Sequence, residues 1–270
     1  MEKKQHTVGS NNIFVEETIP DEEKYSHPLV LVHGSFGGYS MWNMIVEQLS
    51  MAGFHTYALS LRGHKPSGDV DLGTVGMNEY VDDIKTVTTE LKLEKPVVIG
   101  HSMAGLLVLM YSKKNPTAAV IPIDPSTSHE VQGTTDEDIV QRIPLVYNAM
   151  EAGMPTDPAE IMKVLPDISR DVLMQMKDML GTESGLARRD RKRGISITKE
   201  EVHSPILMFG AELGKSVPFG ISLESTQKMG EYYGAEVIEI KGATHPGMLM
   251  GEHSGEVATG ITSWLNKNNG

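Results

Sequence analysis

Short apolar runs alternate with amphipathic segments along most of the chain, and both kinds of segment have lengths typical of regular secondary structure. The short runs that we expect to form strands span 29–34, 55–61, 96–102, 119–124, 205–210 and 236–242. Between them, the segment 77–93 places apolar side chains at helical spacing, at Tyr80, Ile84, Val87 and Leu91. Strands that alternate with helices build a mostly parallel sheet covered on both faces. The pattern therefore predicts an α/β fold.

Further elements are expected toward the two ends of the chain. The segment 12–19 alternates in places and indicates an early strand, which we expect to be antiparallel. The segment 41–53 ends in Gly53, a residue that suits the C-terminus of a helix. A final helix is expected at 256–267.

The alternation of strands and helices is interrupted once, between residues 125 and 204. No strand-like run appears there, whereas 139–153, 158–165 and 169–180 have helical patterns. We therefore expect a single domain with its core in residues 1–124 and 205–270, and a mainly helical cap inserted at 125–204.

The composition narrows the class of partner. The chain has 36 acidic and 24 basic side chains and a formal net charge of −12. Nucleic-acid binding needs a basic face, so this balance argues against nucleic acid and more weakly against anionic membranes. The absence of cysteine excludes disulfides, thiolate metal sites and a cysteine nucleophile. We expect a small-molecule substrate.

Neither a membrane span nor a bound cofactor is expected. No apolar run approaches the roughly 18–20 residues that cross a bilayer, and the polar first residues lack the apolar core of a signal peptide. The histidines show no metal-ligand spacing, and no glycine-rich phosphate loop appears. We therefore expect a cytoplasmic protein without metal or cofactor, and the oligomeric state stays open.

The segment 100–105, GHSMAG, follows a predicted strand and precedes an apolar stretch. A serine nucleophile on a tight strand-to-helix turn needs small residues two positions before and after it, because the turn is strained. Gly100 and Ala104 occupy these positions around Ser102, and Gly105 leaves room for the helix to pack. Ser102 is therefore the candidate nucleophile, with an ordinary strand-to-helix connection as the alternative.

A second glycine-rich segment, HGSFGG at 33–38, follows the predicted strand LVLV. Such a loop lets the backbone approach a reacting oxygen closely. We expect the amides of Ser35 and Met103 to form an oxyanion hole, with Phe36 as the alternative donor and as a residue that contacts the substrate. The alternative is a tight turn without a catalytic role. His33 is expected to hold this loop rather than to act as a base.

His245 lies in KGATHPGML, just after the last predicted strand. A general base is expected near the end of the chain if the catalytic residues follow the order nucleophile, acid, histidine. Of the ten histidines, only His245 follows the final strand on a loop. His253, eight residues later and at an expected helix start, is the alternative.

Four motifs occur together in the order HGSFGG, RGH, GHSMAG and GATH. In this order and spacing they resemble the α/β-hydrolase superfamily, including its small esterases, plant methyl esterases and hydroxynitrile lyases. The resemblance covers essentially the whole chain. It implies an eight-stranded, mostly parallel sheet with helices on both faces and a helical cap. It also implies that Ser102 is the nucleophile and His245 the base.

The triad acid is where the chain departs from that family. Members commonly carry an aspartate after the seventh strand, shortly before a Val-Pro, where this chain has Gly214. Glu212 lies in the same loop, and Asp124 ends the strand from which some members take their acid. Either carboxylate would accept the Nδ1–H of His245 and stabilise the imidazolium. Both could instead be turn or loop residues, which would leave a dyad without an acid.

Two features of the predicted cap have a plain and a functional interpretation. The basic run RRDRKR at 188–193 is expected to be a solvated face or flexible loop, with attraction of an anionic substrate or partner as the alternative. Methionines are frequent in the cap, at Met150, Met154, Met162, Met174, Met176 and Met179. Methionine packs helices and also lines adaptable apolar pockets, so the cap favours an apolar substrate.

Together these observations predict a serine hydrolase that cleaves an ester or lactone of a small, largely apolar substrate through an acyl-enzyme on Ser102. A lyase of the hydroxynitrile lyase type would instead use Ser102 and His245 to move protons without an acyl-enzyme. A binding protein would use the cap pocket as a ligand receptor without turnover. The sequence leaves the identity of the substrate open.

Overall fold

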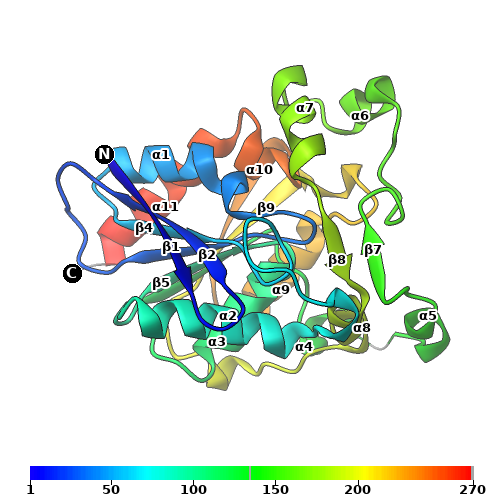
Figure 1. Ribbon diagram of the computed structural model, residues 1–270, viewed down its shortest axis with the longest axis horizontal. Helices are drawn as coiled ribbons and strands as arrows, with labels where there is room; N and C mark the ends of the chain where they lie inside the picture. The colour runs from blue at the N-terminus through cyan, green and yellow to red at the C-terminus, as the bar shows by residue number, and fades with distance from the viewer. Residues whose placement is uncertain (134, 269–270) are drawn as a thin grey trace.

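An eight-stranded sheet forms the centre of the computed structural model, which describes residues 1–133 and 135–268 (Figure 1). In spatial order its strands are β1 (Glu2–Val8), β2 (Ile13–Ile19), β4 (Thr56–Leu59), β3 (Leu29–Val32), β5 (Val97–His101), β6 (Ala119–Ile123), β9 (Leu207–Leu213) and β10 (Glu236–Thr244). The mostly parallel, eight-stranded sheet expected from the sequence is confirmed.

The antiparallel part of the sheet is confined to one edge. β1 and β2 form a hairpin in which Glu2 pairs with Ile19 and Val8 with Ile13, and β2 also pairs antiparallel with β4. The other strand pairs are parallel. The early antiparallel strand predicted at 12–19 is confirmed as β2. β1 has no counterpart in the prediction, because its side chains are mostly polar and exposed and carry no apolar pattern.

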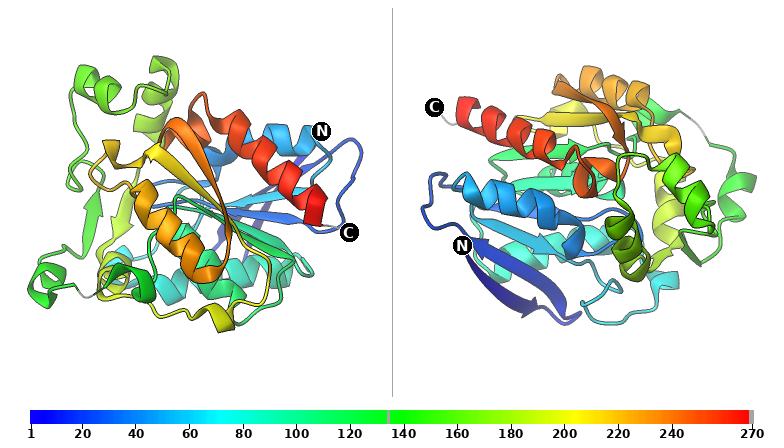
Figure 2. Two further views of the ribbon diagram at one scale, coloured as in Figure 1. Left: turned by 180° about the vertical axis from the view of Figure 1, so that it is seen from behind. Right: turned by 90° about the horizontal axis from the view of Figure 1, so that it is seen from above.

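Helices cover both faces of the sheet (Figure 2). One face carries α1 (Asn43–Met51), α10 (Gly247–Met250) and α11 (Ser254–Asn268), and the other carries α2 (Met77–Glu90), α3 (Met103–Ser112) and α9 (Leu223–Tyr233). In β3, Leu29 and Leu31 pack on the first face, whereas Val30 and Val32 pack on the second. Burial on both faces explains why the central parallel strands, such as β3, are continuous apolar runs.

Between β6 and β9, residues 125–204 form a layer that lies mostly to the right of the sheet in Figure 1. Its elements are α4 (His129–Gln132), α5 (Glu137–Gln141), β7 (Val146–Asn148), α6 (Pro158–Val164), α7 (Arg170–Met179), β8 (Thr182–Ser184) and α8 (Gly185–Arg193).

Short 3-10 helices occur along the chain at η1 (Tyr39–Trp42), η2 (Leu72–Thr74), η3 (Lys199–Glu201) and η4 (Gly214–Ser216). In the described part of the chain, no helix combines the length and apolar character needed to cross a membrane.

The segment 125–204 differs from its prediction in one respect. The helices expected at 158–165 and 169–180 are present as α6 and α7. The expectation that the segment has no strand is wrong, because β7 and β8 pair antiparallel. Strands of three residues are too short to show a period of two, and Pro144 prevents the predicted helix at 139–153 from continuing beyond α5.

The parallel strands bring distant parts of the sequence to one edge of the sheet. Their carboxyl ends meet there, and ligands of open α/β sheets bind in the crevice beyond that edge. The loops that follow β3, β5, β6 and β10 carry Gly34, Ser102, Asp124 and His245. The fold therefore brings Ser102, Asp124 and His245, which the sequence analysis singled out, to one edge of the sheet.

Candidate active site

Ser102 lies between β5 and α3 in a backbone conformation that residues with side chains rarely adopt, with φ +56° and ψ −117°. A Cβ at Gly100 would lie 2.1 Å from the carbonyl oxygen of Ala104, so only glycine fits there. A Cβ at Gly105 would lie 2.6 Å from the Cβ of Pro125. Ser102 therefore lies on a strained turn that holds it at the end of a central strand.

His245 is held by a buried carboxylate. Its Nδ1 donates a 2.5 Å hydrogen bond to Oδ2 of Asp124, and both side chains are buried. Asp124 follows β6 in a left-handed conformation, with φ +44°. Its Oδ1 accepts from the Ala211 amide at 3.3 Å and from the Thr226 hydroxyl at 3.4 Å. These contacts orient the carboxylate toward the imidazole and leave Nε2 as the ring nitrogen for proton transfer.

Gly214, which stands where an aspartate was expected, leaves room for the Asp124 carboxylate. A Cβ at Gly214 would lie 3.0 Å from Oδ2 of Asp124 and 2.1 Å from the carbonyl oxygen of Ile221. Glu212, the other candidate acid, is exposed and accepts a 2.7 Å hydrogen bond from the Gly242 amide. The structure therefore brings Asp124 to His245 and turns Glu212 to the irregular end of the neighbouring strand β10.

The loop after β3 lies against the strained turn that carries Ser102. A Cβ at Gly34 would lie 2.9 Å from the Cβ of Ser102, so the loop backbone passes close to the serine. The Ser35 hydroxyl donates to the sulfur of Met103 at 3.6 Å. Because Met103 is the first residue of α3, this contact places the Ser35 loop beside the N-terminus of that helix.

Phe36 faces the same site with its ring. Its amide donates to the Glu183 carboxylate at 3.4 Å and is therefore engaged by an acceptor of the protein. The ring makes edge contacts with Tyr147 and Phe219, at centroid distances of 5.2 and 5.6 Å. This arrangement favours Ser35 over Phe36 as an amide donor and places the Phe36 side chain in the wall of a cavity.

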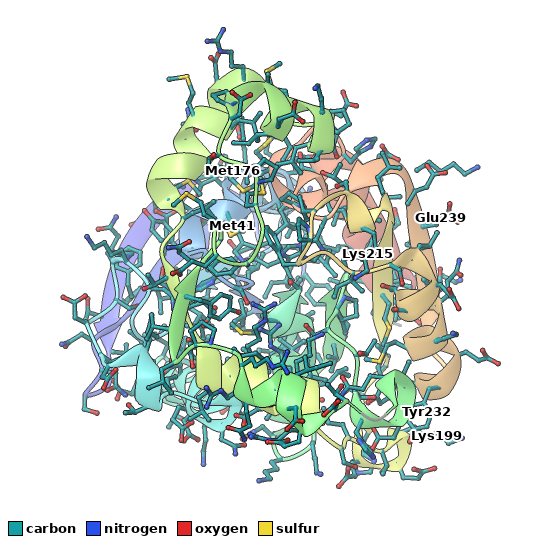
Figure 3. The ribbon with its side chains drawn as sticks, turned by 90° about the vertical axis from the view of Figure 1, so that its right-hand side faces the viewer. Met41, Met176, Lys199, Lys215, Tyr232 and Glu239 are labelled. Atoms are coloured by element: carbon teal, nitrogen blue, oxygen red, sulfur yellow. The ribbon has the colours of Figure 1, made fainter. Side chains whose placement is uncertain are left out.

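Ser102 and His245 both line a cavity of about 190 Å³ beneath the segment 125–204. Its apolar wall consists of Phe36, Met41, Met154, Leu165, Met176, Leu180, Phe219 and Ile221. In Figure 3, Met41 and Met176 lie close together, and Lys215 lies apart from them. Met150, Met162 and Met174 are instead exposed. Within the described part of the chain, no group of three or more His, Cys, Asp or Glu side chains could hold a metal ion.

The basic run at 188–193 is part of α8 and contributes to this cavity. Arg188 and Arg191 are half-buried in its wall, so the expectation of a solvated face or flexible loop is wrong for them. The physical reason is the packing of α8, whose buried Ala187 faces the core and turns these two positions inward. Arg193 fits the expectation, because it is exposed and pairs with Glu137 at 2.7 Å.

A family model described as the alpha/beta hydrolase family matches residues 29–259, which include Ser102, Asp124 and His245. The chain belongs to this family.

Curated relatives of this hydrolase resemble it over part of their length. The 1-acylglycerol-3-phosphate O-acyltransferase ABHD5 of Rattus norvegicus is 28% identical over 157 residues, which are 56% of this chain and 44% of that protein. A monoacylglycerol lipase of Mycolicibacterium smegmatis is 29% identical over 113 residues, 40% of either chain. The matched regions thus span less than half the length of these relatives.

Solved structures of other hydrolases resemble the whole chain. An esterase from Exiguobacterium antarcticum has a TM-score of 0.75 and 16% sequence identity, with 98% of this chain and 100% of that chain covered. A thermophilic esterase from Thermogutta terrifontis has a TM-score of 0.73 and 18% identity, with 99% of both chains covered. At these identities the likeness shows the fold. Family membership supports a hydrolase.

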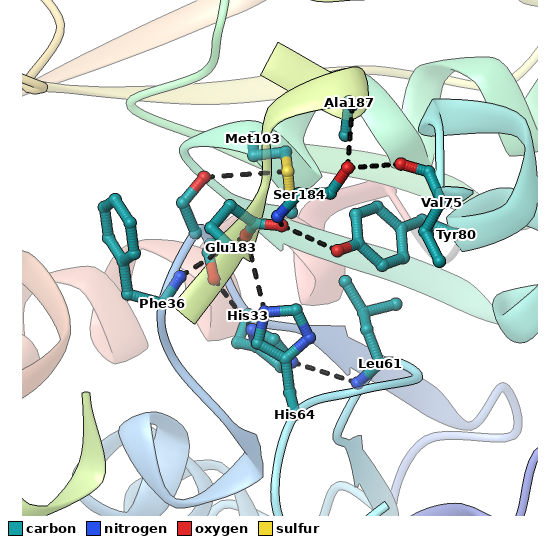
Figure 4. Close-up of polar contacts among 12 residues, drawn as sticks. His33, Phe36, Leu61, His64, Val75, Tyr80, Met103, Glu183, Ser184 and Ala187 are labelled. Atoms are coloured by element: carbon teal, nitrogen blue, oxygen red, sulfur yellow. Dashed lines mark hydrogen bonds and ion pairs between the residues drawn. The ribbon is translucent and has the colours of Figure 1, made fainter. Parts of the chain in front are cut away.

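A carboxylate from the segment 125–204 is buried beside the Phe36 loop of the hydrolase (Figure 4). Glu183, in β8, accepts hydrogen bonds from the Tyr80 hydroxyl at 2.6 Å and from the amides of Ser184 and Phe36 at 2.7 and 3.4 Å. Its Oε2 also lies 3.4 Å from Nε2 of His64, an ion-pair distance. Sequence reasoning missed Glu183, because its role depends on contacts more than 100 residues away along the chain.

The charges of this cluster follow from their mutual contacts. Burial, the largest single influence, would raise the pKa of Glu183, but the charge of His64 and the hydrogen bonds from His64, Tyr80 and Ser184 together outweigh it and hold that pKa at about 2. Burial, the largest single influence, would lower the pKa of His64, but the charge of Glu183, the hydrogen bonds to Glu183 and the Arg62 carbonyl, and the charge of Asp83 together outweigh it and raise that pKa. Burial and the charge of His64 lower the pKa of His33 to about 3. Neutral His33 donates to the Gly34 carbonyl at 2.7 Å and accepts from the Leu61 amide at 3.0 Å, so it holds the loop as expected.

A second buried carboxylate of the segment 125–204 holds the loop that carries His245. Asp167 accepts hydrogen bonds from the amide and the hydroxyl of Thr244, both at 2.7 Å. Its own carbonyl oxygen accepts from the Glu252 amide at 3.0 Å. Asp167 therefore ties the cap segment to the residue that precedes His245.

His101, which directly precedes Ser102, also contacts His245. Its Nε2 donates a 2.9 Å hydrogen bond to the His245 carbonyl, and the two ring centroids lie 4.4 Å apart. Burial, followed by the charge of His245, holds the pKa of His101 well below its usual value. A neutral imidazole at this position adds no charge next to the catalytic candidate.

Glu183→Gln keeps the shape of the side chain but removes the charge that pairs with His64. Removing one partner of a buried ion pair leaves the other without compensation. We expect the free energy of unfolding to fall by about 3 kcal/mol near pH 6, with a Tm lower by roughly 6–12 °C. Calorimetric unfolding of both proteins measures the difference.

This loss of stability should depend on pH. The pKa of Glu183 falls from 4.5 to about 2 on folding, so its contribution is present above pH 4.5 and lost as the pH falls toward 2. The pKa of His64 rises from 6.5, so its contribution is present below pH 6.5 and lost as the pH rises through the folded value. The difference in the free energy of unfolding between the two proteins should peak between pH 4.5 and pH 6.5. A difference that stays constant into the alkaline range contradicts the ion pair, and exposed Glu137→Gln is the control that should change little.

Proposed function

We propose that this hydrolase cleaves carboxylic esters or lactones through an acyl-enzyme on Ser102. The observation that carries the proposal is the 2.5 Å contact between His245 Nδ1 and Asp124 Oδ2, beside the strained turn of Ser102. Both Ser102 and His245 line one cavity. A nucleophile, a base and an acid that orients the base are the groups that acyl transfer requires.

In the first half of the reaction, Ser102 attacks the substrate. Its Oγ forms a bond to the carbonyl carbon while His245 Nε2 takes the hydroxyl proton. The Asp124 carboxylate stabilises the imidazolium that forms. His245 then returns the proton to the leaving oxygen as the ester C–O bond breaks, which releases the alcohol and leaves the acyl group on Ser102.

The tetrahedral intermediate places a negative charge on the former carbonyl oxygen. The amides of Ser35 and Met103 are the proposed donors to this oxygen. Met103 opens the ten-residue helix α3, whose N-terminus also favours a negative charge. In comparable sites one such donor lowers the barrier by roughly 3–4 kcal/mol.

Water completes the cycle. His245 takes a proton from water as the water oxygen attacks the acyl carbon, and it then returns that proton to Ser102 as the acyl-enzyme bond breaks. The net reaction consumes one ester and one water and gives one acid and one alcohol. No redox step or cofactor enters this balance.

The apolar wall of the cavity supports an apolar part of the substrate. Met154, Leu165 and Met176 of the segment 125–204 line the cavity beside Ser102. Methionine adapts its shape to different hydrocarbon groups, which suits a range of acyl or alcohol chains. Similar proteins are named as a monoacylglycerol lipase and as esterases, and these names denote enzymes that act on esters. This agrees with the proposed substrate class.

Ser102→Ala removes the attacking oxygen. We expect turnover of 4-nitrophenyl butyrate to fall by about three orders of magnitude or more. The Tm should stay nearly unchanged, because alanine occupies the same space. Ser112→Ala, at the far end of α3, is the matched control and should retain activity. A Ser102→Ala protein that keeps most of its esterase activity rules out the proposed nucleophile.

A comparison of Asp124→Asn with Glu212→Gln tests the acid. Asparagine at 124 donates where a carboxylate accepted, so it favours the wrong tautomer of His245; we expect kcat to fall by about 10³–10⁴-fold. Glu212→Gln should change kcat little, because Glu212 contacts the Gly242 amide. Steady-state kinetics on one ester give both values. Equal, mild losses in the two variants would show that neither carboxylate is the acid.

A further inference from the structure

Four cationic side chains line the cavity that contains Ser102. Three of them, Arg188, Arg191 and Lys192, come from α8, and Lys215 comes from the loop after β9. Among the side chains that the structure describes, no carboxylate forms an ion pair with any of the four, although the chain carries a net charge of −12. The cavity is therefore a locally positive site in an acidic protein.

Some cations elsewhere in the molecule pair with carboxylates. Arg62 pairs with Asp83 at 2.7 Å, and Arg193, on the same helix as Arg191, pairs with Glu137 at 2.7 Å. An excess of acidic residues makes such pairing easy. The four cations of the cavity wall instead gather beside Ser102 without a carboxylate partner in the described part of the chain, and an anionic ligand would balance their charge.

Arg191 is held in the cavity wall by neutral groups. Its Nη1 donates to the Ser126 hydroxyl at 3.2 Å, and its Nη2 donates to the Ser35 hydroxyl at 3.4 Å. Its Nε donates to the Ala187 carbonyl at 3.4 Å. These contacts fix the guanidinium next to the oxyanion loop and leave its charge without compensation. A planar guanidinium can bind a carboxylate or phosphate through two parallel hydrogen bonds.

The neighbours of Arg191 add to the same positive charge. The guanidinium carbon of Arg188 lies 4.8 Å from the centre of the Tyr147 ring, which is also a neutral partner. Desolvation, followed by the charges of Arg188, Arg191 and Lys215, lowers the pKa of Lys192. Like charges gathered in this way repel one another, and a bound anion would relieve that repulsion.

We propose that this hydrolase acts on esters whose acyl or alcohol part carries an anionic oxygen group, a carboxylate or a phosphate, and that Arg191 is the principal contact of that group. The inference rests on the proposed function, because it places the anion in the cavity of Ser102. The cationic wall binds the anionic end, and the methionine-rich wall binds the hydrocarbon that joins it to the ester.

The test compares three esters that share one leaving group. Their acyl chains are hexanoate, which is neutral, adipate, which ends in a carboxylate, and 5-phosphonopentanoate, each as the mono-4-nitrophenyl ester. We expect kcat/KM of wild type to be at least about tenfold higher for one anionic ester than for the hexanoate, since charge-assisted contacts are strong. The adipate and phosphonate arms distinguish a carboxylate from a phosphate group.

The decisive quantity is the ratio of kcat/KM for the anionic and neutral esters. Arg191→Gln should lower this ratio by about tenfold or more. Arg193→Gln removes the same charge from the same helix outside the cavity and should leave the ratio and the basal activity unchanged. A wild-type ratio of one or less, or a ratio unaffected by Arg191→Gln, overturns the inference while leaving ester hydrolysis intact.

Binding separates this inference from the proposed function. If wild type hydrolyses none of the three esters, the proposed function fails, and the anion site is judged on Ser102→Ala by thermal unfolding. At least one of the two anionic esters should raise the Tm of Ser102→Ala more than the hexanoate does. The double variant with Arg191→Gln should lose that additional shift. Equal shifts for the anionic and neutral esters overturn the inference.

Discussion

The buried contact between Asp124 and His245 is the interaction on which the rest of the site depends. It places an acidic side chain from the end of β6 against a base from the loop after β10, 121 residues later. The approach is possible because Gly214 has no side chain to occupy the space beside the Asp124 carboxylate. Glycine at position 214 and the position of Asp124 are thus linked, and the proposed acid comes from the end of a different strand. Ser102 completes it from a strained turn that the absence of a side chain at Gly100 permits.

The segment between β6 and β9 does more than cover this arrangement. Its Glu183 holds the amide of Phe36, and its Asp167 holds the amide and hydroxyl of Thr244. One carboxylate thus contacts the loop of the proposed oxyanion hole, and the other contacts the residue before His245. Both are buried, so separating either from its partners carries a desolvation cost. A motion that lifts this segment as a unit would therefore disturb both loops.

The parallel core could be predicted from the sequence because strands buried on both faces are long apolar runs, as in β3 and β5. β1 could not, because its pairing rests on backbone hydrogen bonds and its side chains are polar. Ser102 and His245 could be predicted as site candidates, because each lies just after a predicted strand. The choice between Asp124 and Glu212 could not be made, because it depends on which loop approaches His245 in space. That Arg191 points into the cavity could not be predicted either, because the sequence of α8 does not show which face of the helix meets the core.

The most direct test of the central claim is fluorophosphonate labelling of the intact protein, with the modified residue located by mass spectrometry. A nucleophile activated by the His245–Asp124 pair should form one adduct on the peptide that contains Ser102. The labelling rate should fall sharply in Asp124→Asn, because the base loses its orientation. An unlabelled protein, an adduct on another serine, or a rate that does not respond to Asp124→Asn would contradict the account.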